Sequence, residues 1–233
     1  MGKSINIKSI LKRALNAKSD DAKFYAWEAL LEKVRENADS AWEALGELQG
    51  IEDEEASKII GLIGLQYGRG FAVEALKILA KRQDDVSTEW IGNIGCSHGK
   101  KYALDDIGTK ILVDDVGEYA LDAVDILKDR KSIVATHQLG YIAYSHEGKY
   151  ALAVLRIFKD RMEDEDTREI GYIAEDGRLT HGIKVVIEAL KILDERDGKV
   201  AKETIDKIEK IFPELKDRVK PRSIAEIPHL GFA

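Results

Sequence analysis

Residues 71–79 read Phe71-Ala-Val-Glu-Ala-Leu-Lys-Ile-Leu79, and residues 185–193 read Val185-Val-Ile-Glu-Ala-Leu-Lys-Ile-Leu193. The apolar residues of the first stretch follow helical spacing, i, i+3, i+4 and i+7, in the order Ala72, Ala75, Leu76 and Leu79. Such a face of an α-helix must be buried. Related stretches begin at residues 40, 102, 119 and 150, and the starts at 40, 71 and 102, like those at 119 and 150, lie 31 residues apart. The sequence therefore predicts an amphipathic helix that recurs every 31 residues.

A second kind of helix is expected between these copies, and small residues mark it. Its copies lie at residues 60–64, 91–95, 139–143 and 170–174, and they read Ile-Gly-Leu-Ile-Gly, Ile-Gly-Asn-Ile-Gly, Leu-Gly-Tyr-Ile-Ala and Ile-Gly-Tyr-Ile-Ala. A glycine inside a helix costs about 1 kcal/mol relative to alanine, so its recurrence favours a packing role in which a neighbouring helix approaches closely. The alternation of the two kinds predicts helical hairpins that bury their apolar faces by stacking.

The fold class that this repeat predicts is all-α, an α-solenoid of stacked antiparallel hairpins with about 12–13 helices. No stretch sustains the two-residue alternation of a strand, and all three prolines follow residue 212. The 17-residue step from Tyr102 to Tyr119 predicts an extra helix near 100–113, and hence a three-helix unit over about 87–130. The 35-residue step from Tyr150 to Val185 predicts one extra helical turn.

We expect a single repeat domain over residues 1–213, with a capping helix at about 4–17 and a terminal helix at about 199–212. Residues 214–233 would form a C-terminal tail, whose end, Ile227-Pro-His-Leu-Gly-Phe-Ala233, is apolar enough to dock on another surface. The tryptophans occupy positions with core-like helical spacing, and we expect all three in the core: Trp27, Trp42 and Trp90.

The pattern resembles HEAT-like repeats, especially the short repeats of about 30 residues found in the phycobilisome-lyase type. The resemblance covers roughly residues 20–213 and rests on the period, the paired amphipathic helices and the recurring alanine and leucine. The unit over about 87–130 is more similar to a three-helix armadillo unit, and the proline often seen in the first helix of a HEAT repeat is missing. The resemblance implies a role in binding macromolecules, and it implies no catalytic residues.

Polar residues recur at the turn inside each hairpin, in the form Ser/Thr-His-x-x-Lys. We call this set the histidine–lysine ridge; it comprises Ser97, His98 and Lys101, then Ser145, His146 and Lys149, then Thr180, His181 and Lys184, with Arg69 at the equivalent place in an earlier repeat. Hydroxyl, imidazole and ammonium groups at helix N-termini suit a phosphate, an acidic peptide or a nucleic-acid backbone. The alternative is structural, with histidine capping the preceding helix and lysine solvated, and we favour it.

A second column follows the last helix of each hairpin, and we call it the arginine column: Arg82, Arg130, Arg161 and Arg196. These cations could form a basic edge for a ligand. The last three each follow an acidic residue, namely Asp129, Asp160 and Glu195. These acids favour instead a structural ladder of Asp/Glu–Arg contacts that joins successive repeats near helix C-termini, where cations are stabilising.

Composition and charge bound the function. The net charge of −7 and pI near 5.4 argue against broad attraction to nucleic acid or anionic membranes, and no apolar stretch is long enough to span a bilayer. The single cysteine, Cys96, favours a reducing compartment, and we expect a cytoplasmic protein. Asn and Gln are scarce while Ile, Glu, Lys and Arg are common, as is typical of thermophiles.

No catalytic or metal-binding constellation is evident in the sequence, so we expect neither an enzyme nor a cofactor. The predicted function is a non-catalytic scaffold that binds a protein or peptide partner along its helical surface. The alternative is a module that uses the histidine–lysine ridge to bind an anion, a phosphate or a nucleic-acid backbone, which the acidic charge disfavours.

Overall fold

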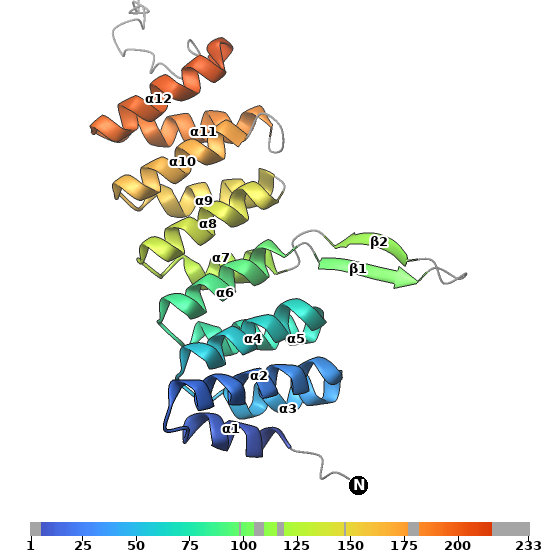
Figure 1. Ribbon diagram of the computed structural model, residues 1–233. Coiled ribbons are helices and arrows are strands. Elements are labelled where there is room, and N and C mark those ends of the chain that lie inside the picture. Colours follow the sequence, from blue (N-terminus) through green and yellow to red (C-terminus); the bar gives the residue numbers. More distant parts are fainter. Residues whose placement is uncertain are drawn as a thin grey trace, which may run out of the picture. The chain divides into compact units, whose positions relative to one another are not determined.

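A computed structural model describes residues 6–97, 99–104, 110–115, 119–146, 148–176 and 182–215 of the chain (Figure 1). The chain divides into two compact units, Met1–His146 and Glu147–Ala233. Twelve helices lie within the described residues, and they confirm the predicted all-α fold class. That both units continue one solenoid stays a prediction, and the apolar end of the tail lies outside the described residues.

The first unit contains eight helices and one hairpin of strands. The helices are α1 (Ile7–Leu15), α2 (Asp20–Glu36), α3 (Ala38–Leu48), α4 (Glu54–Tyr67), α5 (Arg69–Ala80), α6 (Asp85–Cys96), α7 (Ala120–Leu127) and α8 (Ile133–Ser145). The strands are β1 (Gly99–Leu104) and β2 (Lys110–Asp115). The second unit contains α9 (Gly148–Lys159), α10 (Asp164–Asp176), α11 (Ile183–Asp194), α12 (Lys199–Ile211) and the 3-10 turn Pro213–Leu215.

Side-chain caps fix where several of these helices begin. The Ser19 hydroxyl accepts the Ala22 N–H at 3.3 Å and caps the start of α2. The α6 helix is capped by Asp84, whose carboxylate accepts the Ser87 N–H at 2.7 Å. Each capped N–H is one of the donors that a helix cannot satisfy internally.

Alternate helices of the first unit pack side by side, with α4 against α6 and α6 against α8, while α3, α5 and α7 follow one another in a second row. Glycines allow the close contact in the first row. A methyl group on Gly61 of α4 would overlap the Trp90 ring of α6, and one on Gly95 of α6 would lie 2.9 Å from Ile142 Cδ1 of α8. The recurring glycine therefore has the packing role that the sequence predicted.

The second unit repeats this arrangement with its own elements. The α10 helix packs against α11 and α12, and α9 packs against α11. A methyl group on Gly171 of α10 would lie 2.5 Å from Thr204 Cγ2 of α12. Phe158 of α9 and Leu193 of α11 are fully buried, so the apolar faces expected from their helical spacing form the core of this unit.

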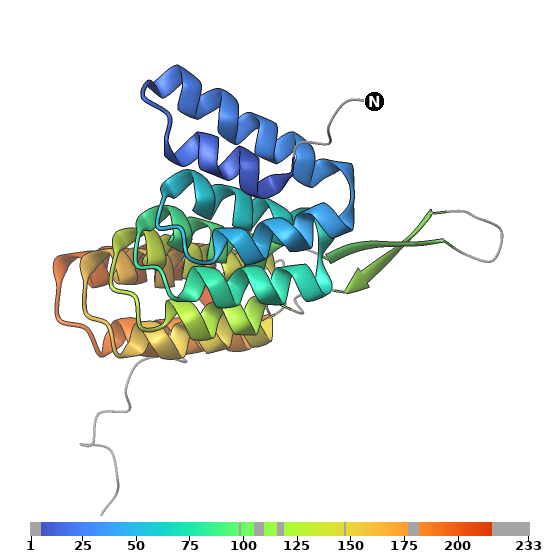
Figure 2. The ribbon, with the colours of Figure 1, turned by 90° about the horizontal axis from the view of Figure 1, so that it is seen from below.

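The predicted helix near 100–113 is wrong, and with it the three-helix unit. Residues 99–104 and 110–115 instead form an antiparallel hairpin with Gly99 opposite Asp115 and Leu104 opposite Lys110. The run Ile111-Leu-Val113 is rich in β-branched residues, which favour strands, whereas the copy of Tyr-Ala-Leu at residue 102 is too short to specify a helix. In Figures 1 and 2 the hairpin extends away from the helices of its unit.

The prediction that all three tryptophans lie in the core is correct for Trp27 and wrong for Trp42, and Trp90 is only half-buried. Trp27 is 4% exposed, whereas Trp42 is 45% exposed. The Trp42 ring instead lies against the Phe71 ring, with centroids 4.3 Å apart, beside the exposed Gly70. The buried residues of α3 are Ser40, Ala41, Ala44, Leu45 and Leu48, so Trp42 lies beside the buried face of its helix and not on it.

Replacing Gly95 and Gly46 separately by alanine tests the close approach of the helices. Gly95→Ala is expected to lower the free energy of unfolding by about 1–3 kcal/mol, because the new methyl would lie 2.5 Å from Ala123 Cβ. Gly46→Ala in α3 meets no atom within 4 Å and is expected to raise it by about 0.5–1 kcal/mol. Urea unfolding followed by circular dichroism measures both. Stabilisation by both substitutions would contradict close packing at Gly95.

Candidate functional site

Much of the histidine–lysine ridge lies outside what the structure describes. His98, Thr180 and His181 are outside the described residues, and so are the side chains of Arg69 and Lys101. Ser97 is described, and its hydroxyl donates to the Ile94 carbonyl at 2.6 Å, which caps the end of α6. At Ser97 the contact therefore favours the structural interpretation, in which the ridge residues cap the preceding helix.

The middle copy of the ridge is turned into the first unit. His146 is 4% exposed, and its Nε2 lies 2.7 Å from the Gly95 carbonyl oxygen in the last turn of α6. The neighbouring Ser145 hydrogen-bonds Cys96, whose burial raises the pKa of the thiol to about 12. The anion-binding interpretation predicts an exposed donor at His146, and this prediction is wrong, because the imidazole is buried and joins α8 to α6.

The two lysines of the ridge in the second unit are exposed. Lys149 lies in the first turn of α9, and its Nζ is 4.7 Å from the centroid of the Tyr150 ring. Lys184 lies in the first turn of α11, after Gly182, which has a φ of 76° and supplies no side-chain cap. Among the described side chains, these two lysines are therefore what the ridge offers to a solvent-borne anion.

The arginine column, in contrast, is largely buried. Arg82 is 8% exposed and follows α5. Its Nη1 donates to the Ser57 hydroxyl of α4 at 2.7 Å, and its Nη2 donates to the Leu48 carbonyl at the end of α3 at 2.9 Å. The last carbonyls of a helix have no partner within the helix, so a buried cation there both supplies donors and opposes the helix dipole.

Arg130 makes the same contacts one hairpin further along the first unit. Its Nη1 donates to the Thr88 hydroxyl of α6 at 2.5 Å. Its Nη2 donates to the carbonyls of Leu79 and Arg82, at the end of α5, at 3.0 and 2.5 Å. The guanidinium therefore ties the first helix of its own hairpin to the second helix of the preceding hairpin.

Arg196 repeats this geometry within the second unit. It donates to the Thr167 hydroxyl of α10, and to the Phe158 carbonyl of α9 at 2.5 Å. Burial lowers the pKa of Arg196, as it does for Arg82 and Arg130. Arg161 is half-buried, with Nη1 3.9 Å from Asp166 Oδ1.

The prediction that the preceding acids hold these arginines is wrong for Arg196. Glu195 is exposed and pairs with Lys159 at 3.4 Å, while Arg196 binds a hydroxyl and carbonyls. Asp129 and Asp160 are also exposed. The sequence carried a usable signal for the real partners: a Ser or Thr stands four residues before the glycine of each first helix, at Ser57, Thr88, Thr136 and Thr167.

A chain of hydrogen bonds leads from Arg82 to the carboxylate of Asp84. Arg82 donates to Ser57, whose hydroxyl lies 3.0 Å from that of Ser87, and Ser87 donates to Asp84 Oδ2 at 2.6 Å. Burial raises the pKa of Asp84, but the bonds from the Ser87 hydroxyl and N–H and the charge of Arg82 outweigh it, so the pKa is lowered. This series of hydrogen bonds joins the buried Arg82 guanidinium to the Asp84 carboxylate, which lines a hollow in the surface.

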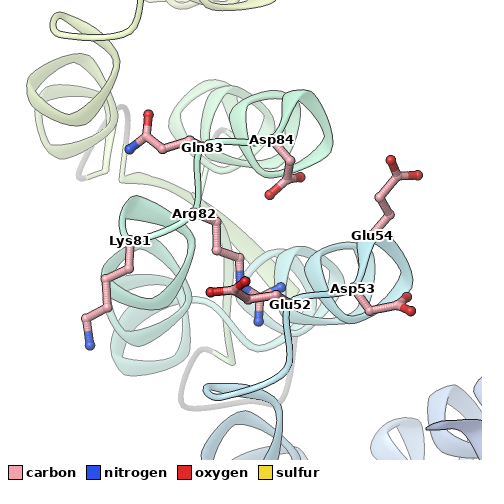
Figure 3. Close-up of a pocket in the computed structure, with 7 residues that line it drawn as sticks. All are labelled: Glu52, Asp53, Glu54, Lys81, Arg82, Gln83 and Asp84. Atoms are coloured by element: carbon pink, nitrogen blue, oxygen red, sulfur yellow. The ribbon is translucent and has the colours of Figure 1, made fainter.

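That carboxylate belongs to a hollow between the loops that precede α4 and α6 (Figure 3). We call it the acidic hollow; it has a volume of about 380 Å³ and is lined by Glu52, Asp53, Glu54, Lys81, Arg82, Gln83 and Asp84. Four of these side chains are acidic and two are basic. Because Arg82 turns inward to Ser57, the hollow presents mainly carboxylates to the solvent.

Two of the four carboxylates are already engaged. Asp53 accepts from Lys23 Nζ at 2.8 Å and from the Glu55 N–H at 2.9 Å, and Asp84 caps α6. Glu52 and Glu54 are exposed. In Figure 3 the Glu54 carboxylate points away from the ribbon. The hollow can therefore offer two carboxylates to a cationic group without dismantling a helix cap or the Lys23 ion pair.

Comparison with protein-family models, with curated proteins and with solved structures found no match to this chain. None of the helices that the structure describes combines the length and the apolar character needed to cross a membrane.

Replacing Arg82 by alanine tests how much its buried hydrogen bonds contribute to the stability of the first unit. Arg82→Ala leaves the Ser57 hydroxyl and the Leu48 carbonyl without their donor, so we expect a loss of about 2–4 kcal/mol in the free energy of unfolding. Lys81→Ala, at the exposed neighbouring position, is the matched control and should change stability by less than about 0.5 kcal/mol. Equal effects in urea unfolding would show that the arginine contacts carry no special weight.

Proposed function

We propose that this protein is a non-catalytic scaffold of the HEAT-like repeat type that binds a basic segment of a partner protein or peptide in the acidic hollow. The observation that carries the proposal is the hollow itself, a concave site of about 380 Å³ with exposed Glu52 and Glu54. This volume lies within the range of sites that enclose a ligand group. The helical pairs of each unit supply the rigid support that such a site needs.

The charge of the chain supports the same kind of partner. The net charge is −7, and a complementary basic segment would be steered toward it. A lysine or arginine side chain entering the hollow would meet Glu52 and Glu54, while Lys81 and Arg82 bound the other side. We also propose a reducing compartment, and hence the cytoplasm, because the chain has one cysteine.

A short peptide rich in lysine and arginine, titrated calorimetrically, tests the proposal. The double substitution Glu52→Gln with Glu54→Gln is expected to weaken its binding by about 2- to 30-fold, since each exposed ion pair contributes about 0.2–1 kcal/mol. The affinity of the unmodified protein should also fall as salt is added.

The double substitution Glu28→Gln with Glu32→Gln is the matched control, because it removes two exposed carboxylates from α2, outside the hollow. It should leave the affinity for the basic peptide close to that of the unmodified protein. Equal weakening in both variants, or equally tight binding of a glutamate-rich peptide, would contradict recognition in the acidic hollow.

A second candidate function is anion binding in the second unit. We base it on Lys149 and Lys184, which are exposed in the first turns of the two adjacent helices α9 and α11. The N–H groups that start a helix and the positive end of its dipole favour an anion. A phosphate or a nucleic-acid backbone would supply one.

Binding of a single-stranded oligonucleotide at several salt concentrations tests this candidate. Replacing Lys149 and Lys184 by alanine should weaken binding and flatten the dependence of log affinity on log salt by about 1.4, since each neutralised phosphate of a single strand contributes about 0.7. Lys159→Ala with Lys191→Ala, in the last turns of the same helices, is the control. An unchanged slope in the first variant would rule out this pair of lysines.

A further inference from the structure

We infer that the hairpin of β1 and β2 is a self-association element, and that two copies of this chain pair through their β2 strands. The inference rests on the hairpin and is independent of the acidic hollow. It starts from the position of the hairpin, which joins α6 to α7 where the other hairpins of helices have a short turn. Both views show it extending away from the helices (Figures 1 and 2).

The hairpin lacks the support that a strand pair ordinarily needs. Among the described elements, β1 and β2 form a sheet of two strands and make their extensive contacts with each other. An isolated pair of strands is marginally stable in water, and three or more strands or a covering helix are needed. The outer edge of β2 also presents backbone N–H and C=O groups that no described strand satisfies.

The sequence of β2 is complementary to itself when it is read in the opposite direction. Lys110-Ile-Leu-Val-Asp114 has a cation at one end, an anion at the other and three apolar residues between them. If two copies run antiparallel with Leu112 opposite Leu112, then Ile111 meets Val113 and Lys110 meets Asp114 of the other copy. Opposite charges and paired apolar side chains across strands are both stabilising.

Symmetry selects this register from the alternatives. A two-fold axis that relates neighbouring antiparallel strands stands perpendicular to the sheet, so that each residue opposes the one equally far beyond the central residue. A centre at Ile111 would place Lys110 opposite Leu112, and a centre at Val113 would place Leu112 opposite Asp114. Both registers leave Lys110 without an opposite charge, whereas the centre at Leu112 pairs Lys110 with Asp114 at both ends.

The β1 strand does not offer the same complementarity. It reads Gly99-Lys-Lys-Tyr-Ala-Leu104. A two-fold centre at Lys101 would oppose two like charges, and a centre at Tyr102 would place Lys100 opposite Leu104. Lysine on an edge strand opposes pairing with another chain. The expected assembly is therefore one sheet of four strands in the order β1, β2, β2 of the second copy and β1 of the second copy.

Charge substitutions that leave the hairpin intact test the pairing. Lys110→Asp places two carboxylates opposite each other at each end of the β2–β2 pair, while its partner within the hairpin is the uncharged Leu104. The double substitution Lys100→Asp with Asp114→Lys keeps an opposite-charge pair inside the hairpin and places two lysines opposite each other between copies. For each variant alone, the dimer dissociation constant should be at least about tenfold higher than that of the unmodified chain.

Mixing the two variants supplies the decisive measurement. One contributes carboxylates at positions 110 and 114 and the other contributes lysines, so that a mixed dimer regains both ion pairs. Sedimentation equilibrium of the full chain should show a dimer for the unmodified protein, monomers for each variant and a mixed dimer when they are combined. Lys77→Asp, on exposed α5 surface, is the matched control and should dimerise like the unmodified chain.

Three results would overturn the pairing: a monomeric unmodified protein at high concentration, a dimer unaffected by Lys110→Asp, or variants that fail to associate when mixed. Circular dichroism keeps these outcomes interpretable. Among the described elements, the two strands make extensive contacts only with each other, so all variants should keep the helical signal of the unmodified protein. A variant that lost this signal would be replaced by the milder Lys110→Gln, which removes both ion pairs and should still weaken the dimer.

Discussion

Within each unit, the stacking of one helical hairpin on the next depends on a buried guanidinium at the place where the two hairpins meet. A helix ends with carbonyl groups that have no partner of their own, and stacking one hairpin on the next would bury them. Arg82 and Arg130 in the first unit and Arg196 in the second place two donor groups there, one toward a hydroxyl and one toward those carbonyls. Because the guanidinium is planar and fork-shaped, it also fixes how far apart the neighbouring helices lie.

The glycines allow the close approach of the helices that the arginines join at their ends. Gly61 and Gly95 let α4, α6 and α8 approach at distances that any larger residue would prevent, so the row of first helices is held by contact along its length and by arginine at its end. Because the Arg82 guanidinium turns inward to Ser57 and the Leu48 carbonyl, the loops before α4 and α6 present mainly carboxylates to the solvent. The acidic hollow on which the proposed function rests is therefore a by-product of how the hairpins are joined.

The β1–β2 hairpin is an insertion between α6 and α7 that leaves the packing of these two helices unchanged. The α6 and α7 helices contact each other as the helices of the other pairs do, although residues 97–119, including two strands, separate their ends. Closing a longer loop adds little entropic cost, so an insertion at such a turn is tolerated. The inserted strands are consequently free to serve a contact outside the repeat, which is the role inferred for β2.

The sequence by itself determined the features that depend on local periodicity. These are the all-α class, the apolar faces of the helices, the glycine faces and the column of arginines, because the 3.6-residue period is visible in neighbouring residues. Only the tertiary structure decided that Arg196 binds Thr167 and not Glu195, that His146 is buried against Gly95 and that Trp42 is left exposed. Thr167 lies 29 positions from Arg196 and Gly95 lies 51 positions from His146, so the periodicity of a single helix does not identify these partners. The hairpin at Gly99–Asp115 was missed for a related reason. The structure of a short segment depends on the segments that it pairs with, and the three residues Tyr102-Ala-Leu104 that resemble the start of a helix do not specify one against strand pairing.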